Sequence, residues 1–223
     1  ALRILRFPPL WALIIGLTRQ IHLARDNQTA ATWRPMIGDR ARREDELGGK
    51  TLLIVGLGRI GLRLATLAAA FGLRIIGVRR SPEPHPDIEA IVRPDQLHEV
   101  LAQADIVALT CPLTPETENL IDATALAAMK PGALLINVAR GKVVDEKALI
   151  AALSEGRIAG AGLDTFVEEP LAASSPLWAM KKVIVTPHSA GETRAYETNV
   201  VDLLVDNLAR LGRGETTLRN QVV

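Results

Sequence analysis

Several polar side chains in this sequence follow apolar runs, and together they could carry out acid–base chemistry on an anionic substrate. Arg140 comes just after the run 133–138, and an arginine in such a place is rarely buried without an anionic partner. A carboxylate held by two hydrogen bonds is the simplest partner. His188 could give up a proton near neutral pH, and Glu168 or Glu169 could orient its ring. Hydride transfer to a keto acid would need these groups, because the carbonyl oxygen takes up a proton and the carboxylate must be held.

Each of these residues also has an ordinary structural explanation. Arg140 could form a structural salt bridge, and a histidine directly after a proline, as His188 is, is often a satisfied loop residue. Asp164 could cap a helix, and Glu168 and Glu169 could form a solvated turn. It is less plausible that all of these explanations hold at once, because all of these residues follow strands of one expected sheet.

The elements that would position these residues are short apolar strands alternating with helices. The expected strands are 51–55, 73–78, 106–110, 133–138, 158–163 and 183–186. The expected helices are 10–28, 59–71, 95–102, 122–129, 145–155 and 192–211. Such alternation predicts an α/β fold with a doubly wound parallel sheet. Because the carboxyl ends of parallel strands lie along one edge, where ligands bind, the polar residues are expected to converge there.

A glycine-rich turn follows the first expected strand. The segment Gly56-Leu57-Gly58-Arg59-Ile60-Gly61 has the spacing GxGxxG. Its glycines allow a tight turn and close approach of a pyrophosphate, which the N–H groups at the start of the next helix would bind. A lone motif of this kind is weak, but the strand before it and the helix after it are both expected here. The sequence therefore predicts a dinucleotide-binding sheet of the Rossmann type.

The end of the second expected strand bears on the choice of dinucleotide. NAD-binding chains usually have an acidic residue there, which accepts hydrogen bonds from the ribose hydroxyls. This chain has Arg79, Arg80 and Ser81 instead. Two guanidiniums and a hydroxyl suit a 2′-phosphate better than a diol, so the sequence favours NADP, with NAD as the second choice. A solvated basic loop is the structural alternative.

Composition narrows the range of partners. The chain has 223 residues, 48% of them hydrophobic, and a formal net charge of +1, which gives no argument for binding nucleic acid or a membrane surface. The single cysteine, Cys111, excludes an internal disulfide. The apolar run 7–17 is too short to cross a membrane, and no signal-peptide cleavage site follows, so we expect a cytoplasmic protein. His22, His85 and His98 lack the spacing of a metal site, and no metal is expected.

These motifs resemble one family, the D-isomer-specific 2-hydroxyacid dehydrogenases. The resemblance rests on the glycine turn and on the segments 111–117, 129–145, 163–170 and 186–191. It covers nearly all of residues 10–215, and it implies that the active-site arginine, glutamate and histidine of the family fall on Arg140, Glu169 and His188. The family glutamate is the one directly before a proline, so the resemblance selects Glu169 over Glu168.

The resemblance also implies which residues contact the cofactor. The family's aspartate at the nicotinamide end falls on Asp164, and Cys111 is expected to pack near the cofactor rather than to act as a nucleophile. The full expected set is Gly56, Gly58, Arg59, Ile60, Gly61, Arg79, Arg80, Ser81, Cys111, Pro112, Thr117, Val138, Ala139, Arg140, Asp164, His188, Ala190 and Gly191.

Two departures from the family pattern matter. The family's ribose-binding aspartate falls on Arg79, as in the NADP-using glyoxylate and hydroxypyruvate reductases of the family. The N-terminal substrate-binding domain of the family is expected to be absent. The expected layout is an N-terminal helix and connector for dimerisation, 1–49, a dinucleotide-binding domain, 50–191, and a C-terminal helix and tail, 192–223.

The leading hypothesis is an oxidoreductase that transfers a hydride between NAD(P)H and a small 2-keto or 2-hydroxy acid of D configuration, or the cofactor-binding domain of one, in a homodimer. The alternative is a non-catalytic NAD(P)-sensing dimer of the corepressor type. The expected absence of the substrate-binding domain favours it, and the presence of Arg140, Glu169 and His188 does not exclude it. A formate or phosphite dehydrogenase ranks lower, because formate enzymes of the family have glutamine in place of Glu169. Which acid is the substrate does not follow from the sequence.

Overall fold

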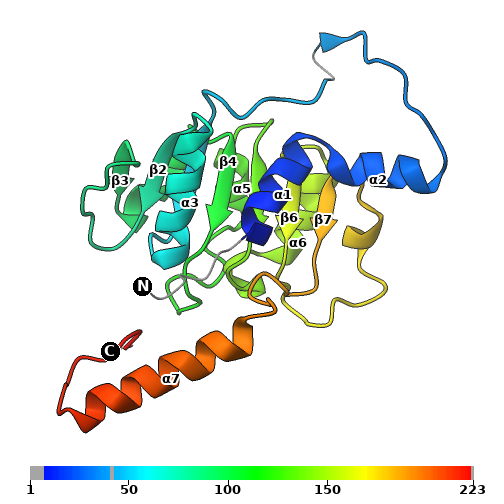
Figure 1. Ribbon diagram of the computed structural model, residues 1–223. Helices are drawn as coiled ribbons and strands as arrows, with labels where there is room; N and C mark the ends of the chain where they lie inside the picture. The colour runs from blue at the N-terminus through cyan, green and yellow to red at the C-terminus, as the bar shows by residue number, and fades with distance from the viewer. Residues whose placement is uncertain (1–7, 41–42, 222–223) are drawn as a thin grey trace. The chain divides into compact units, whose positions relative to one another are not determined.

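The structure of the chain is a computed structural model that describes residues 8–40 and 43–221. It divides into two compact units, residues 1–190 and 191–223. The larger unit holds a parallel sheet with helices on both faces, and the smaller unit holds one helix (Figure 1). All of the predicted catalytic residues lie in the larger unit.

Seven strands form the sheet in the described part of the chain. They are β1 (Thr51–Val55), β2 (Arg74–Val78), β3 (Ala90–Val92), β4 (Ile106–Leu109), β5 (Leu134–Asn137), β6 (Gly160–Leu163) and β7 (Val183–Val185). Their order is β3-β2-β1-β4-β5-β6-β7, and every neighbouring pair is parallel. The predicted doubly wound parallel sheet is confirmed, and the order reverses between β1 and β4. The sequence pattern did not reveal β3, which has only three half-buried residues.

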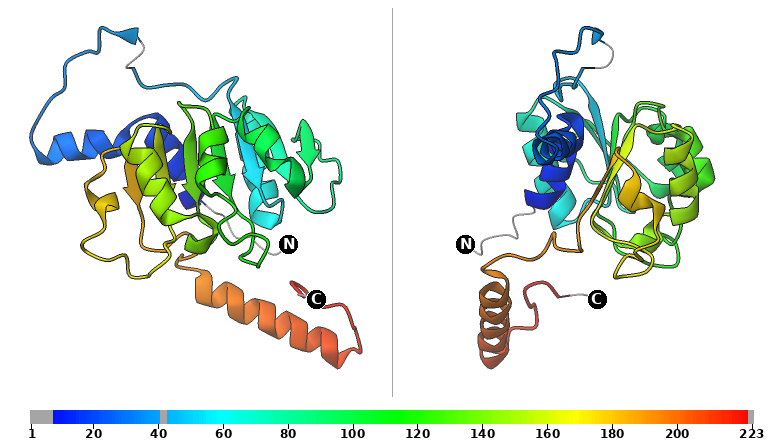
Figure 2. Two further views of the ribbon diagram at one scale, coloured as in Figure 1. Left: turned by 180° about the vertical axis from the view of Figure 1, so that it is seen from behind. Right: turned by 90° about the vertical axis from the view of Figure 1, so that its right-hand side faces the viewer.

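Helices cover both faces of the sheet. They are α1 (Pro8–Thr18), α2 (Ile21–Thr29), α3 (Arg59–Ala70), α4 (Leu97–Leu101), α5 (Ala123–Ala128) and α6 (Glu146–Ser154) in the larger unit, and α7 (Tyr196–Gly212) in the smaller. Helices α1 and α3 lie on one face of the sheet, and α4, α5 and α6 lie on the other (Figure 2). This arrangement leaves the carboxyl ends of the strands and the loops after them to form the site.

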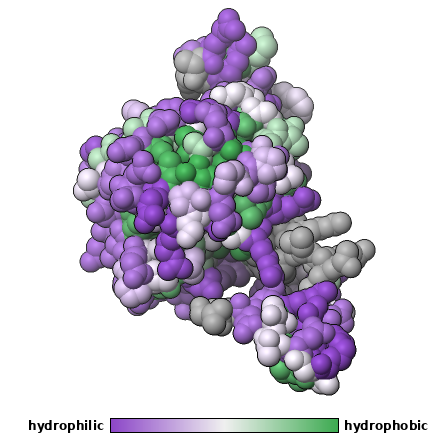
Figure 3. All heavy atoms as spheres, turned by 90° about the vertical axis from the view of Figure 1, so that its left-hand side faces the viewer, coloured by the Kyte–Doolittle hydropathy of each residue, from purple (hydrophilic) through white to green (hydrophobic). Residues whose placement is uncertain are grey.

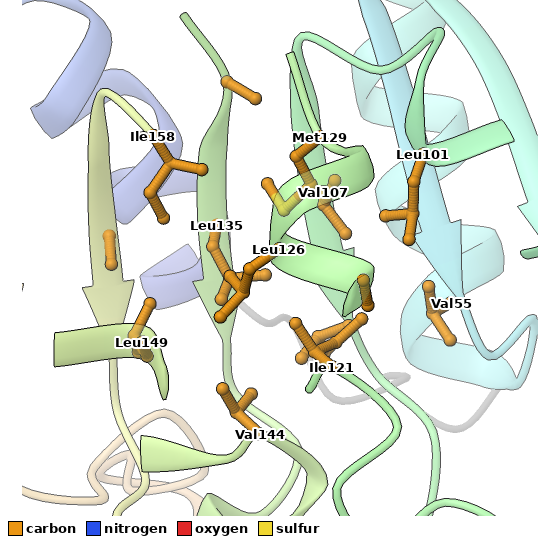
Figure 4. Close-up of a cluster of buried hydrophobic side chains, with 14 of the residues drawn as sticks. Val55, Leu101, Val107, Ile121, Leu126, Met129, Leu135, Val144, Leu149 and Ile158 are labelled. Atoms are coloured by element: carbon orange, nitrogen blue, oxygen red, sulfur yellow. The ribbon is translucent and has the colours of Figure 1, made fainter. Parts of the chain in front are cut away.

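Both faces of the sheet are covered by apolar side chains. Under α4–α6 the cluster includes Val107, Leu126, Leu135 and Leu149 (Figure 4). Full burial of each such side chain stabilises the fold by about 1.5–3 kcal/mol. On the opposite face α1 approaches β6 closely, since a Cβ added to Gly162 would lie 3.0 Å from Leu13 Cβ. Small residues in β6 therefore let α1 pack against the sheet.

The expectation of one helix over residues 10–28 is wrong, because the chain forms α1 and α2 with a break between them. Gln20 has a φ of 50°, the left-handed conformation, which interrupts the helical hydrogen bonds. The break coincides with a change in side-chain character. Helix α1 buries apolar residues such as Leu10 and Ile14, whereas α2 buries none. The connector that follows α2 is irregular, as expected.

Capping residues set the starts of the two helices that flank the site. Asp122 accepts a hydrogen bond from Ala125 N at 2.8 Å, and Asp145 accepts one from Ala148 N at 3.1 Å. Both are N-caps, so α5 and α6 begin one residue after the expected 122 and 145. The helix expected over 95–102 is shorter, because a 3-10 turn precedes α4.

In the smaller unit, α7 is hydrogen-bonded to the segment that follows it. Asn207 of α7 accepts a hydrogen bond from Arg219 N at 2.8 Å and donates one to Arg219 O at 3.0 Å. The helix begins at Tyr196, four residues later than the expected 192.

Among the described residues, no helix is both long and apolar enough to span a membrane. The face of the larger unit at the β3 end of the sheet is mostly hydrophilic, with a hydrophobic area near its centre (Figure 3).

Candidate active site

The glycine-rich turn lies between β1 and α3, at the reversal of the strand order. Gly56 has a φ of 101°, which other residues rarely adopt, and a Cβ there would lie 2.6 Å from Cys111 N. A Cβ on Gly61 would lie 2.2 Å from Gly56 O. By contrast, no atom lies within 4 Å of a Cβ built on Gly58 in the described structure. The turn is thus tightly packed at its two ends and open at its middle, which suits a bound pyrophosphate at the start of α3.

Both neighbouring strands hold this turn in place. The side chain of Leu57 lies against Gly77 of β2, where a Cβ would come within 2.4 Å of Leu57 Cδ1. Thr110, just after β4, donates a hydrogen bond from Oγ1 to Gly56 O at 2.6 Å. The turn therefore needs Gly77 and Thr110 as well as its own glycines.

Arg79, Arg80 and Ser81 follow β2 at the same edge of the sheet. The Arg79 side chain is partly buried, with Nη1 3.7 Å from Glu83 Oε2. The pKa of Glu116, in the loop after β4, is lowered first by a hydrogen bond from a neighbouring threonine and also by the charge of Arg80. Two guanidiniums thus follow β2, and that of Arg79 is paired with Glu83.

Cys111 and the loop that it begins are shaped by packing and internal hydrogen bonds. Burial raises the pKa of the Cys111 thiol to about 11, so little reactive thiolate is present near neutral pH. Thr117 donates a hydrogen bond to Pro112 O at 2.7 Å, and its hydroxyl accepts one from Thr114 N at 2.8 Å. These two bonds fix the loop opposite the glycine turn.

Arg140 is held just beyond β5 by a turn that Asn137 closes. The buried Asn137 side chain accepts a hydrogen bond from Ala139 N and donates one to Arg140 O, both at 3.0 Å. Arg140 itself is exposed, and its Nη1 donates to Ala139 O at 2.6 Å. Within residues 8–40 and 43–221 its guanidinium forms no ion pair, so it can receive an anion.

Glu169 and His188 form a hydrogen-bonded pair. Glu169 Oε2 lies 2.7 Å from His188 Nδ1, and Oε1 accepts a hydrogen bond from Phe166 N at 2.9 Å. Since a carboxylate only accepts, Nδ1 must carry a proton, and Nε2 is the nitrogen that can exchange one. Burial raises the pKa of Glu169, but hydrogen bonds from His188 and Phe166 and the charges of His188 and Arg140 leave it below its ordinary value. Arg140, Glu169 and His188 thus follow β5, β6 and β7 at one edge of the sheet.

Asp164, after β6, holds the turn that presents His188. Its fully buried carboxylate accepts hydrogen bonds from Thr186 Oγ1 at 2.5 Å, Ser189 N at 3.0 Å and Ala190 N at 2.9 Å. These donors flank His188, whose φ of 54° is left-handed. Of the two oxygens, Oδ2 accepts only the bond from Ala190 within the described residues, so it has room for one more donor.

A cavity of about 590 Å³ opens beside the Glu169–His188 pair. Its other lining residues are mostly apolar: Phe166, Pro170, Leu171, Trp178, Val185 and Pro187. The Trp178 indole is fixed by a hydrogen bond from Nε1 to Ala172 O at 3.0 Å. A molecule that meets His188 could therefore place an apolar group against this wall.

Not every expected site residue lies in this cluster. Glu168 is exposed, and Glu169 is the glutamate that pairs with the histidine. Gly191 belongs to the smaller unit. No group of three or more His, Cys, Asp or Glu side chains suited to a metal occurs in the described part of the chain. Thr165 Oγ1 is buried with no hydrogen-bond partner among the described residues.

The sequence did not indicate some residues that shape the site. Asn137 and Thr186 position Arg140 and His188 through hydrogen bonds, and Thr110 supports the glycine turn. The one usable signal was Asn137, a polar residue at the end of an apolar run that needs a buried partner. Thr186 and Thr110 gave no signal, because a hydroxyl at the end of a strand has many uses.

Comparison with known proteins identifies the family. Residues 11–190 match the family model "D-isomer specific 2-hydroxyacid dehydrogenase, NAD binding domain". The chain is 39% identical to a glyoxylate reductase of Aeropyrum pernix, over 92% of this chain and 62% of that protein. It is 42% identical to glyoxylate/hydroxypyruvate reductase B of Escherichia fergusonii, over 89% of this chain and 61% of that protein. The chain thus spans about three-fifths of the length of these curated relatives.

Solved structures agree with this assignment. A D-isomer specific 2-hydroxyacid dehydrogenase from Xanthobacter autotrophicus Py2, in complex with NADPH and MES, superimposes with a TM-score of 0.84 at 35% identity. The match covers 97% of this chain and 86% of that one. The predicted resemblance is confirmed, and the chain belongs to the D-isomer specific 2-hydroxyacid dehydrogenase family, over its NAD binding domain.

Proposed function

We propose that the chain carries the cofactor domain and the catalytic groups of an NAD(P)H-dependent reductase of small 2-keto acids, which also oxidises the corresponding D-2-hydroxy acids. The observation that carries the proposal is the Glu169–His188 hydrogen bond of 2.7 Å, with Arg140 close enough to act on the same carboxylate. The reductase names of the relatives support it. They give no support to a non-catalytic sensing module.

In this mechanism the three residues divide the work. Arg140 binds the substrate carboxylate and so orients the adjacent carbonyl. His188 donates a proton from Nε2 to the carbonyl oxygen as negative charge develops there. Glu169 keeps the proton on Nδ1 and stabilises the imidazolium before the transfer. The bound dinucleotide supplies the hydride.

The proposed cofactor is NADP, with NAD accepted less well. The open middle of the glycine turn fits a pyrophosphate, and Arg79 and Arg80 fit a 2′-phosphate. The bound NADPH of the Xanthobacter structure supports this choice. The double variant Arg79→Asp, Arg80→Ala should raise the Kd for NADPH and shift the NADPH/NADH affinity ratio towards NADH. An unchanged ratio, or the same shift in a control Arg63→Ala on exposed α3 surface, would refute the assignment.

The activity itself can be tested with glyoxylate and hydroxypyruvate. Consumption of NADPH is followed by absorbance, in this chain and in the full-length protein that its gene encodes. We expect His188→Gln to lower turnover by about 100- to 10,000-fold while the Kd for NADPH stays within the error of the unmodified protein. A full-length protein that binds NADPH but reduces no small 2-keto acid would contradict the proposal.

We also propose that the protein is a cytoplasmic homodimer that pairs through residues 1–49. Ile21, Trp33 and Met36 expose large apolar side chains there, and Trp33 is 96% exposed. Such surface is costly in water unless a second copy covers it. Sedimentation of the unmodified chain should give a dimer, and the double variant Trp33→Ser, Met36→Ser should give a monomer. A monomeric unmodified chain would overturn the pairing.

A further inference from the structure

The segment that carries Arg140 packs directly against the segment that carries Glu169. A Cβ on Gly141 would come within 1.9 Å of the Phe166 carbonyl carbon and 2.4 Å of Val167 N. Only glycine allows the two backbones to approach so closely. The carboxylate-binding arm and the proton-donor arm of the proposed site are therefore in backbone contact.

A second contact joins the same two stretches of chain. Glu146, the first residue of α6, accepts a hydrogen bond on Oε2 from Val167 N at 3.1 Å, across 21 residues of sequence. The preceding backbone N–H, that of Phe166, donates to Glu169 Oε1 at 2.9 Å. Two consecutive N–H groups are thus divided between two carboxylates, of which Glu169 touches His188 and Glu146 does not.

We propose that Glu146 is a positioning residue, which orients Glu169 and, through it, His188. The inference rests on the proposed function, because it assigns Glu146 a part in preparing the proton donor. By accepting a hydrogen bond from Val167 N, Glu146 fixes the plane of the Phe166–Val167 peptide. This in turn fixes the direction in which the Phe166 N–H donates to Glu169.

Loss of the hydrogen bond between Glu146 and Val167 N would change which ring nitrogen of His188 carries the proton. The exposed Val167 N–H would then bond to water, and the Phe166–Val167 peptide would no longer be held in one orientation. Glu169, which accepts from the N–H of Phe166, would then be held less firmly and could move away from His188 Nδ1, which is 2.7 Å from Oε2 in the structure. The Nδ1 proton would no longer be held, and the neutral ring would share its proton between both nitrogens.

A purely structural role for Glu146 can be separated from this one. An acidic residue in the first turn also stabilises a helix through the helix dipole, so its removal could weaken α6 alone. Asp145 provides the matched control, because it caps the same helix through Ala148 N and, within the described part of the chain, forms no hydrogen bond or ion pair with residues 164–170. Glu146→Asp keeps the charge at the helix start but is too short to reach Val167.

The test is nitrogen-15 NMR of histidine-labelled chain, with the His188 signals assigned by their loss in His188→Gln. In the unmodified chain we expect the signature of a protonated Nδ1 and an unprotonated Nε2 above neutral pH. Glu146→Asp and Glu146→Ala should lose this signature, while Glu146→Gln, which can still accept from Val167 N, should keep it. Asp145→Ala should keep it and unfold at a lower temperature.

Two outcomes would overturn the positioning role. One is that Glu146→Asp keeps the NMR signature of a protonated Nδ1 on His188. The other is that Asp145→Ala loses it. In the full-length protein, Glu146→Asp should lower kcat by up to about 100-fold with KM nearly unchanged. The NMR result does not depend on turnover, so an error in the proposed substrate would leave it intact, and an active enzyme with an unaffected Glu146→Asp spectrum would refute Glu146 alone.

Discussion

Replacing Asp164 by alanine is expected to destabilise the larger unit more than any other single truncation at the site. The carboxylate is fully buried and accepts three hydrogen bonds, from a hydroxyl and two backbone N–H groups. A hydrogen bond to a charged group contributes about 1.5–3 kcal/mol, and each buried donor left unpaired costs about 1–3 kcal/mol. Because Ser189 is only partly buried and can turn to water, we expect a total loss of roughly 3–5 kcal/mol.

Urea unfolding followed by circular dichroism measures this loss. With a slope of about 1–3 kcal/mol per molar urea, the midpoint should fall by roughly 1–5 M without a change in slope. The control Thr186→Val removes one of the three donors and keeps the side-chain shape, so it should cost about 1–2 kcal/mol. If Asp164→Ala lowers the free energy of unfolding by less than about 1 kcal/mol, or by no more than Thr186→Val does, then the carboxylate does not hold the His188 turn.

Three further results are expected. Gly61→Ala should abolish NADPH binding, measured by fluorescence, because its Cβ would lie 2.2 Å from Gly56 O. Gly58→Ala, with open space around its Cβ, should leave the fold intact. An equal loss of folding stability in both variants would contradict this. Alkylation of Cys111 at pH 8 should be roughly 100-fold slower in the folded than in the unfolded chain, since its pKa rises from 9.0 to about 11; equal rates would disprove burial of the thiol. The pKa of Glu169 is lowered by folding, so its stabilising effect is present above the ordinary value of 4.5 and is lost as pH falls through the lowered value. The difference in free energy of unfolding between the unmodified chain and Glu169→Gln should accordingly shrink in acid, and a pH-independent difference would refute the shift.

The convergence of the site followed from the sequence because it depends on topology alone. Once the strands are parallel, whatever follows each of them lies at one edge, and so Arg140 and His188 could be placed together without any contact being known. The left-handed backbone of Gln20 could not be foreseen, because glutamine has no preference for it. Nor could the bond between Glu146 and Val167 N, which depends on how two loops 21 residues apart pack in space.

The packing of the Leu57 side chain against Gly77 has a consequence for how the preference for one dinucleotide can change. The packed contact ends with Val78, which is buried, whereas Arg80 and Ser81 expose their side chains beyond it. Substitutions at these outer positions therefore disturb no core contact, and they can change the preference between the two dinucleotides without loss of the fold. A larger residue at Gly77 would have to displace the Leu57 side chain and so would disturb the glycine turn itself. Selection can thus alter the preference of this domain while its capacity to bind a dinucleotide stays fixed.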